Sequence, residues 1–226
     1  MQKLSIFIDG YNLYHAVDNL KKPHLKWANP RIFCKFFVNH KFEDVARIKF
    51  FTAFPKHKSF EVQARYKDFT DALKHYDIEV VEGNFKKKLV TINLDGQHHT
   101  KITHEEKESD VNIALAILED AFEKTSDRIL VITNDSDITP AIKMAREKNK
   151  ELKINILTPP LQKTKQISNS LYFASGNVGR DKKGQIFHNF KMIKEFMLEQ
   201  AIMPDEIIDK DGKKIIIPDE YKKYSR

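Results

Sequence analysis

The sequence lacks the features of secreted and membrane proteins. It contains one cysteine, Cys34, so no disulfide can form within the chain. No apolar run approaches the roughly 20 residues that a helix needs to cross a bilayer. The first residues lead directly into an apolar strand pattern rather than a secretory signal. We therefore expect a cytoplasmic protein that does not enter a membrane.

Basic residues outnumber acidic ones in this chain. The 226 residues include 39 Lys and Arg against 32 Asp and Glu, a net charge of +7. The length suits one domain of ordinary size with an appendage. A basic surface favours a polyanionic partner such as nucleic acid, although a modest positive charge also serves solubility alone.

Apolar segments alternate with amphipathic segments along most of the chain. Helices are predicted over residues 60–76, from Val111 onward, and over residues 138–150. This alternation is typical of an α/β fold with a mostly parallel sheet flanked by helices. The predicted strands are residues 4–8, 47–53, 78–82, 128–133 and 153–157.

Residues 85–103 interrupt the alternation. Two strand-like stretches flank Asp95-Gly96, which is a strong turn signal, so an inserted β-hairpin is predicted. Its basic side chains could contact a phosphate backbone, but they also suit any exposed edge of a sheet. These side chains are Lys86, Lys87, Lys88, His98, His99, Lys101 and His104.

The pattern changes again after residue 178. Residues 187–201 are predicted to form a helix, and the polar tail after them a small hairpin or an extended arm. We expect a main domain at residues 1–178 and a C-terminal extension at residues 179–226.

Acidic residues occur at three predicted strand ends or helix starts. Asp9 follows the first strand, Asp135 and Asp137 follow the fourth, and Asp110 begins the helix from Val111. If the first and fourth strands are neighbours in a parallel sheet, these carboxylates meet in one crevice. A divalent cation would relieve their repulsion, and hard oxygen ligands suit Mg²⁺ or Mn²⁺. Such ions activate water for attack on a phosphodiester.

Each acid also has a purely local interpretation. Asp137 stands before Thr139-Pro140 as a helix N-cap would. Asp110 can complement a helix dipole, and Asp9 can belong to a simple turn. For any single residue the local interpretation is the simpler one, but three such positions together are not easily explained by capping.

Four short motifs carry a resemblance to a known family. They are FIDGYNL at residues 7–13, VEGNFK at 81–86, EEKESDVN at 105–112 and NDSD at 134–137. In this order, over about residues 4–175, the chain resembles the NYN domain family of PIN-like nucleases, and within it the bacterial LabA-like branch.

The resemblance implies a Rossmann-like sheet of about five strands and a metal-dependent RNA endonuclease. Asp9, Asp110 and Asp135 would bind Mg²⁺ or Mn²⁺, and Asp137 would be a fourth catalytic acid. Further residues would contact RNA or orient the carboxylates, although Asn12 also suits a turn and Lys107 also suits a solvated position. They are Asn12, Ser109, Asn134, Ser136 and Lys107.

The chain departs from the family pattern at two places. Many relatives carry Gly where Asn134 stands, and Ala-Asp where this chain has Ala174-Ser175-Gly176. The second departure removes an acid that would support the site. The alternative function is therefore a non-catalytic nucleic-acid-binding or regulatory module.

Two further patterns have ordinary explanations. The three histidines of the predicted hairpin lack the spacing of a structural zinc site. Trp27, Phe33, Phe36 and Phe37 could stack nucleic-acid bases, but such clusters usually pack a core or a contact between two copies of a chain.

Overall fold

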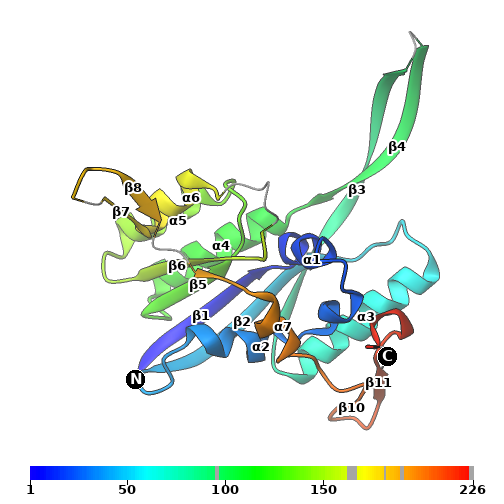
Figure 1. The fold of residues 1–226 in the computed structure, drawn as a ribbon, viewed down its shortest axis with the longest axis horizontal. Helices are drawn as coiled ribbons and strands as arrows, with labels where there is room; N and C mark the ends of the chain where they lie inside the picture. Colours follow the sequence, from blue (N-terminus) through cyan, green and yellow to red (C-terminus); the bar gives the residue numbers. More distant parts are fainter. Residues whose placement is uncertain (95–96, 162–166, 181, 189–190, 224–226) are drawn as a thin grey trace.

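A single seven-stranded sheet organises the chain (Figure 1). The computed structural model describes residues 1–94, 97–161, 167–180, 182–188 and 191–223. The strand order is β4-β3-β2-β1-β5-β6-β9, parallel throughout except for the antiparallel β3-β4 pair. These strands are β1 (Gln2–Asp9), β2 (Glu43–Ala53), β3 (Glu79–Leu94), β4 (Gln97–Lys107), β5 (Arg128–Ile132), β6 (Lys153–Thr158) and β9 (Lys191–Met192).

Helices cover both faces of the sheet. Along the central strand β1, Leu4, Ile6 and Ile8 pack with α1 and α3, whereas Phe7 packs with α4, α5 and α6. Side chains alternate between faces along a strand, so one apolar run supplies two cores. The α-helices are α1 (Gly10–Asp18), α2 (Pro30–Phe33), α3 (Phe60–His75), α4 (Ser109–Glu123), α5 (Thr139–Lys148), α6 (Asn169–Ser175) and α7 (Glu195–Glu199), with 3₁₀ turns η1 (Pro23–Trp27), η2 (Cys34–Phe37) and η3 (Asp219–Tyr221).

The predicted α/β class, the five predicted strands and the three predicted helices are confirmed. The expected number of strands in the sheet was too low, because β4 and β9 extend it at its two edges. Neither edge was recognisable as part of the main sheet from local periodicity. Both are added by pairing between strands, which is a tertiary event.

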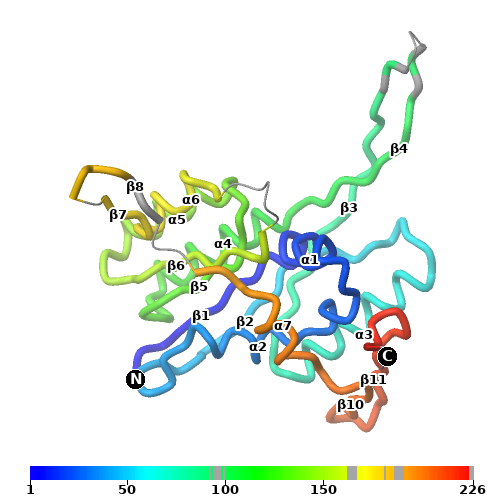
Figure 2. Tube along the Cα trace, viewed as in Figure 1, coloured from blue at the N-terminus to red at the C-terminus, as the bar shows by residue number. Residues whose placement is uncertain are grey.

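The predicted hairpin is present as a long arm. The first residues of β3, Glu79 to Gly83, pair with β2, and from Asn84 onward β3 pairs with β4. Beyond the base, the two strands project away from the body of the molecule (Figures 1 and 2). The arm that we discuss below comprises residues 84–94 and 97–107.

The prediction of a helix over residues 187–201 was wrong for most of that range. Helix is present only at α7, while the segment before it contains β8 (Ile186–His188) and β9, and residues 189–190 lie outside the described part. Lys191 and Met192 pair with the end of β6, so an available sheet edge overrides local helix preference. Strand β8 pairs with β7 (Val178–Arg180).

The polar tail was predicted to be either a small hairpin or an extended arm, and it forms the hairpin. Strand β10 (Glu206–Ile208) pairs with β11 (Lys214–Ile216), and this hairpin packs beside α3. Trp27 is fully buried there, and its indole N–H donates to the carbonyl oxygen of Pro204 at 3.0 Å. Phe33 and Phe37 are also buried, which leaves Phe36 as the exposed member of that predicted aromatic cluster.

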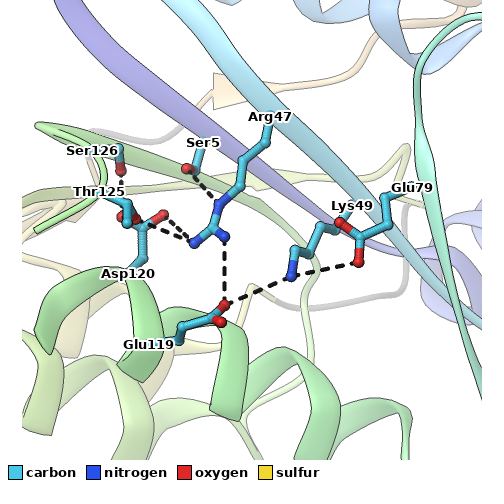
Figure 3. Close-up of polar contacts among 8 residues, drawn as sticks. All are labelled: Ser5, Arg47, Lys49, Glu79, Glu119, Asp120, Thr125 and Ser126. Atoms are coloured by element: carbon cyan, nitrogen blue, oxygen red, sulfur yellow. Dashed lines mark hydrogen bonds and ion pairs between the residues drawn. The ribbon is translucent and has the colours of Figure 1, made fainter. Parts of the chain in front are cut away.

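A buried ion pair ties α4 to the sheet (Figure 3). Asp120 is fully buried and accepts hydrogen bonds from Arg47 (3.1 Å), Thr125 (2.7 Å) and Ser126 (2.7 Å). Arg47 also donates to the hydroxyl of Ser5 at 3.2 Å. Burial alone would raise the pKa of Asp120, but these hydrogen bonds outweigh it and hold the pKa below its usual range.

Candidate active site

Asp9 lies at the carboxyl end of the central strand and is almost completely buried. Its carboxylate accepts from the backbone N–H of Asn12 and from the hydroxyl of Thr133, each at 2.8 Å. It therefore caps α1, where the local interpretation had offered only a simple turn. A Cβ atom on Gly10 would lie 2.6 Å from the carbonyl oxygen of Phe51, so only glycine lets α1 begin this close to β2.

Asp9 is a poor acid in this environment. Burial raises its pKa to about 7, and the charges of Asp110 and Asp135 act in the same direction. The hydrogen bonds from Asn12 and Thr133 oppose the shift without cancelling it. Among the described residues, no basic side chain lowers this pKa.

The turn between β5 and α5 holds two further acids. The backbone N–H of Asp135 donates to the hydroxyl of Thr133 at 3.0 Å, and that of Asp137 donates to the carboxylate of Asp135 at 3.0 Å. The N-cap residue of α5 is Ile138, with no side-chain capping bond. Asp137 is exposed and does not perform the capping role that its sequence context suggested.

Asp110 lies in the first turn of α4 beside the same carboxylates. The N-cap of this helix is Glu108, which has a left-handed φ of 81° and makes no side-chain capping bond. The pKa of Asp110 is raised to about 6, mainly by burial. The charges of Asp135, Glu106 and Asp137 act in the same direction. Strained backbone of this kind is often retained where it positions a functional group.

The structure thus brings together four predicted acids: Asp9, Asp110, Asp135 and Asp137. Sequence analysis missed two residues beside them. Glu106 adds negative charge next to Asp110 and accepts from the backbone N–H of Ser109 at 3.1 Å. Thr133 connects Asp9 to the Asp135 turn, and its position directly after a buried strand was the available signal.

Amide side chains connect this centre to a neighbouring pocket. Asn12 accepts from the backbone N–H of Asn134, and Asn134 accepts from that of Ser168, each at 3.2 Å. The pocket has a volume of about 240 Å³. It is lined by Asn12, Ala16, Asn19, Asn134, Asp135, Ser136, Pro159, Pro160 and Leu161.

Ser109 differs from the other predicted polar residues because it is buried. It is 2% exposed, and within the described residues its hydroxyl has no hydrogen-bond partner. A buried hydroxyl without a partner is costly. Ser109 lies next to Asp110 at the start of α4.

The predicted lysine contacts divide into two kinds. Lys107 and Lys88 each form an ion pair with Glu105, both at 3.2 Å, on the arm surface. The remaining predicted lysines are exposed along the arm: Lys86, Lys87 and Lys101.

Comparison with known proteins identifies the family. The NYN domain model matches residues 3–175, which is most of the chain. This chain belongs to the NYN domain family. Its acidic centre lies where the matched region brings β1, β5 and α4 together.

A solved structure supports the same fold for this NYN protein. A crystal structure of a protein of unknown function from Vibrio parahaemolyticus is similar with a TM-score of 0.52 and 17% identity. The similarity covers 86% of this chain and 94% of that one. At this identity the likeness concerns the fold alone.

One named relative shares a short segment. The chain is 40% identical over 55 residues to 6-hydroxy-3-succinoylpyridine 3-monooxygenase from Pseudomonas putida. That segment is 24% of this chain and only 17% of the relative. So short a match says nothing of what this NYN protein acts on.

The acidic centre fits a divalent cation by its donor chemistry. In the described ranges, no three His, Cys, Asp or Glu side chains are already arranged around one metal position. The centre nevertheless offers hard carboxylate oxygens; burial first, and then their mutual repulsion, raises the pKa of Asp9 and Asp110. A bound Mg²⁺ or Mn²⁺ would relieve that repulsion.

The arm histidines give no support to zinc binding. His98 and His104 stand six residues apart along β4, roughly 20 Å at the rise of a strand. His104 instead stacks on His57, with ring centroids 4.0 Å apart. The side chain of His99 lies outside the described part.

The departure at Ser175 lies away from the acids. Helix α6 starts near Asn134, which accepts from Ser168, and runs for seven residues to Ser175. At the helical rise this is roughly 10 Å. The Ser175 hydroxyl donates to the carbonyl oxygen of Tyr172 within its own helix, at 3.0 Å. Two residues beyond Ser175, Asn177 accepts from the side-chain amide of Asn155, which itself accepts from Arg128 at the amino end of β5, the end opposite Asp135.

Across the described residues, no helix has both the length and the apolar character needed to span a membrane.

Proposed function

We propose that this NYN protein is a metal-dependent ribonuclease that cuts within RNA strands. Asp9, Asp110 and Asp135 would hold the metal, with Asp137 as the fourth acid. The observation that carries the proposal is the meeting of acids from β1, α4 and the β5-α5 turn, where no described basic side chain lowers the pKa of Asp9 or Asp110. Their mutual charge contributes to a raised pKa in both Asp9 and Asp110.

Mg²⁺ or Mn²⁺ bound there would lower the pKa of a water molecule and neutralise charge on the phosphodiester. The side chains of the protein would position the carboxylates and the substrate. Thr133 holds the Asp9 carboxylate and the Asp135 backbone in one network. Ser109 and the side-chain amides of Asn12 and Asn134 would donate to phosphate or metal-bound water. Asn12, Asn134 and Ser136 line the adjoining pocket.

The RNA strand would lie along the arm. Lys86, Lys87 and Lys101 are exposed there, and Lys88 and Lys107 share one acidic partner. A net charge of +7 despite the acidic centre supports attraction of a polyanion. On this proposal residues 1–178 carry the chemistry, and the chain belongs to the bacterial LabA-like branch that its four motifs resemble.

The test is cleavage of end-labelled single-stranded and hairpin RNA with Mg²⁺, Mn²⁺ or EDTA. Wild type, Asp135→Asn and a control Asp44→Asn would be compared. Asp44 is exposed near the amino end of β2, opposite Lys3, at the edge of the sheet away from the acids. We expect metal-dependent cutting by wild type and control, and loss of about 1,000-fold in Asp135→Asn.

Two results would contradict the proposal. Equal cutting by Asp135→Asn and wild type would mean a different centre or a contaminating nuclease. No cutting by wild type, with RNA still bound, would instead support the non-catalytic module.

A further inference from the structure

An aromatic track begins at the acidic centre and runs to the base of the arm. Tyr11 lies two residues after Asp9 in the first turn of α1, and its ring centroid is 6.4 Å from that of Phe85 in β3. Phe85 is 4.6 Å from His57, in the segment between β2 and α3. His57 stacks on His104 of β4 at 4.0 Å, with 7° between the ring planes. We call these four residues the aromatic track.

The aromatic track lies at the surface rather than in the core. Tyr11 is 41% exposed, and the other three rings are half-buried. Tyr11 and Phe85 meet at 64°, so these two rings are not stacked upon each other. Contiguous exposed aromatic surface of this kind commonly marks a binding site.

Charges at the two ends of the track favour different parts of a nucleic-acid strand. Near the centre, the Glu106 carboxylate places negative charge beside Tyr11. Without a bound cation, a phosphate would be repelled there, whereas an uncharged base would not. Beyond Phe85 the arm continues with Lys86, Lys87 and Lys88, which suit phosphates.

We propose that the aromatic track stacks unpaired bases of a single-stranded RNA whose backbone lies along the arm lysines. The inference rests on the proposed ribonuclease function, because the track would lead the strand to the acidic centre. Single-stranded RNA is the occupant because base faces are accessible to protein rings only when the bases are not stacked within a duplex. Stacking on the aromatic track would also orient the RNA strand relative to Asp9.

The experiment separates base contacts from backbone contacts. A fluorescein-labelled ten-nucleotide RNA and a strand of the same length without bases would be titrated with full-length protein in EDTA, so that no cutting occurs. The variants are Phe85→Leu, Tyr11→Leu and a matched control Phe36→Leu. Phe36 is 44% exposed and contacts Phe196 of α7, outside the aromatic track.

We expect Phe85→Leu and Tyr11→Leu each to weaken binding of the normal RNA about 5- to 150-fold. Binding of the baseless strand should be unchanged, and Phe36→Leu should behave as wild type. Thermal unfolding verifies that each variant is folded, and exposed Tyr11 provides the second test if Phe85→Leu does not fold.

The proposed role of the aromatic track would be wrong if the variants lost equal affinity for both strands or lost none for either. It would also be wrong if the wild-type protein did not bind the RNA. Because binding is measured without metal, its outcome is independent of cleavage. If the variants lose affinity only for the RNA with bases but the protein never cuts RNA, the aromatic track is supported and the nuclease proposal is wrong. If cutting requires Asp135 but the variants bind both strands as wild type does, the nuclease is supported and the aromatic track is wrong.

Discussion

Asp120 and the pair of Asp9 and Asp110 have opposite surroundings; Asp120 and Asp9 are buried, and Asp110 is half-buried. Asp120 is enclosed by Arg47 and by the hydroxyls of Thr125 and Ser126, and its pKa is held low (Figure 3). Asp9 and Asp110 lie among other acids, and burial with mutual repulsion raises their pKa values to about 7 and about 6. Both groups contact the same central strand.

On the proposed function, this difference separates an acid that stabilises the fold from acids that would bind a cation. A buried carboxylate with an arginine and several donors is already satisfied, so it has little to offer an incoming cation. Carboxylates that repel each other at the carboxyl edge of a parallel sheet gain by binding one. The contrast leads to three predictions about stability.

The largest expected effect concerns pH. The pKa of Asp9 in the folded protein, about 7, exceeds its ordinary value of 3.8, so the folded state binds more protons between these values. Stability should therefore fall as pH rises from 4 to 7 in EDTA, with an upper bound on the order of 4 kcal/mol. Urea unfolding of wild type and Asp9→Asn across this range measures the difference, since asparagine can still cap α1.

Asp120 should show the opposite trend. Its lowered pKa contributes stability that is present above the ordinary carboxyl range and is lost as pH falls through its folded pKa.

If the stability difference between wild type and Asp9→Asn does not change between pH 4 and 7, the Asp9 carboxyl is not the poor acid described above.

The second prediction makes the same chemical change in both groups. Asp120→Asn removes the charge that compensates Arg47 and should lower the free energy of unfolding by about 3 kcal/mol. Asp110→Asn removes a repelling charge and should leave the free energy of unfolding unchanged or raise it. Urea unfolding at pH 7.5 in EDTA compares the two, and a larger loss for Asp110→Asn would reverse our assignment of their roles.

The smallest expected effect is that of metal on stability. Mn²⁺ at 100 times its Kd should stabilise wild type by about 2.7 kcal/mol, because it binds the folded state. The gain should disappear in Asp110→Asn and persist in Asp120→Asn wherever that variant is folded. Thermal unfolding with Mn²⁺ and with EDTA provides the measurement; an equal gain in Asp110→Asn would place the metal elsewhere.

Most of the central architecture was predictable because its signals are local. Strand β1 contains a continuous apolar run, and α4 presents a clear apolar face. The β9 edge was not predictable, because Lys191 and Met192 form a strand only by pairing with β6. Glu106 was missed as well, because its charge acts on Asp110 across the junction between β4 and α4.

The sequence by itself determined the α/β class, the main strands and helices, and which acids stand at strand ends and helix starts. These features follow from periodicity and turn chemistry within a few residues. Only the tertiary structure decided that Asp9 and Asp135 share Thr133, that Asp120 is compensated by Arg47, and that the aromatic track is continuous. Burial and charge act through space between residues far apart in the chain, and those distances exist only once the sheet has formed.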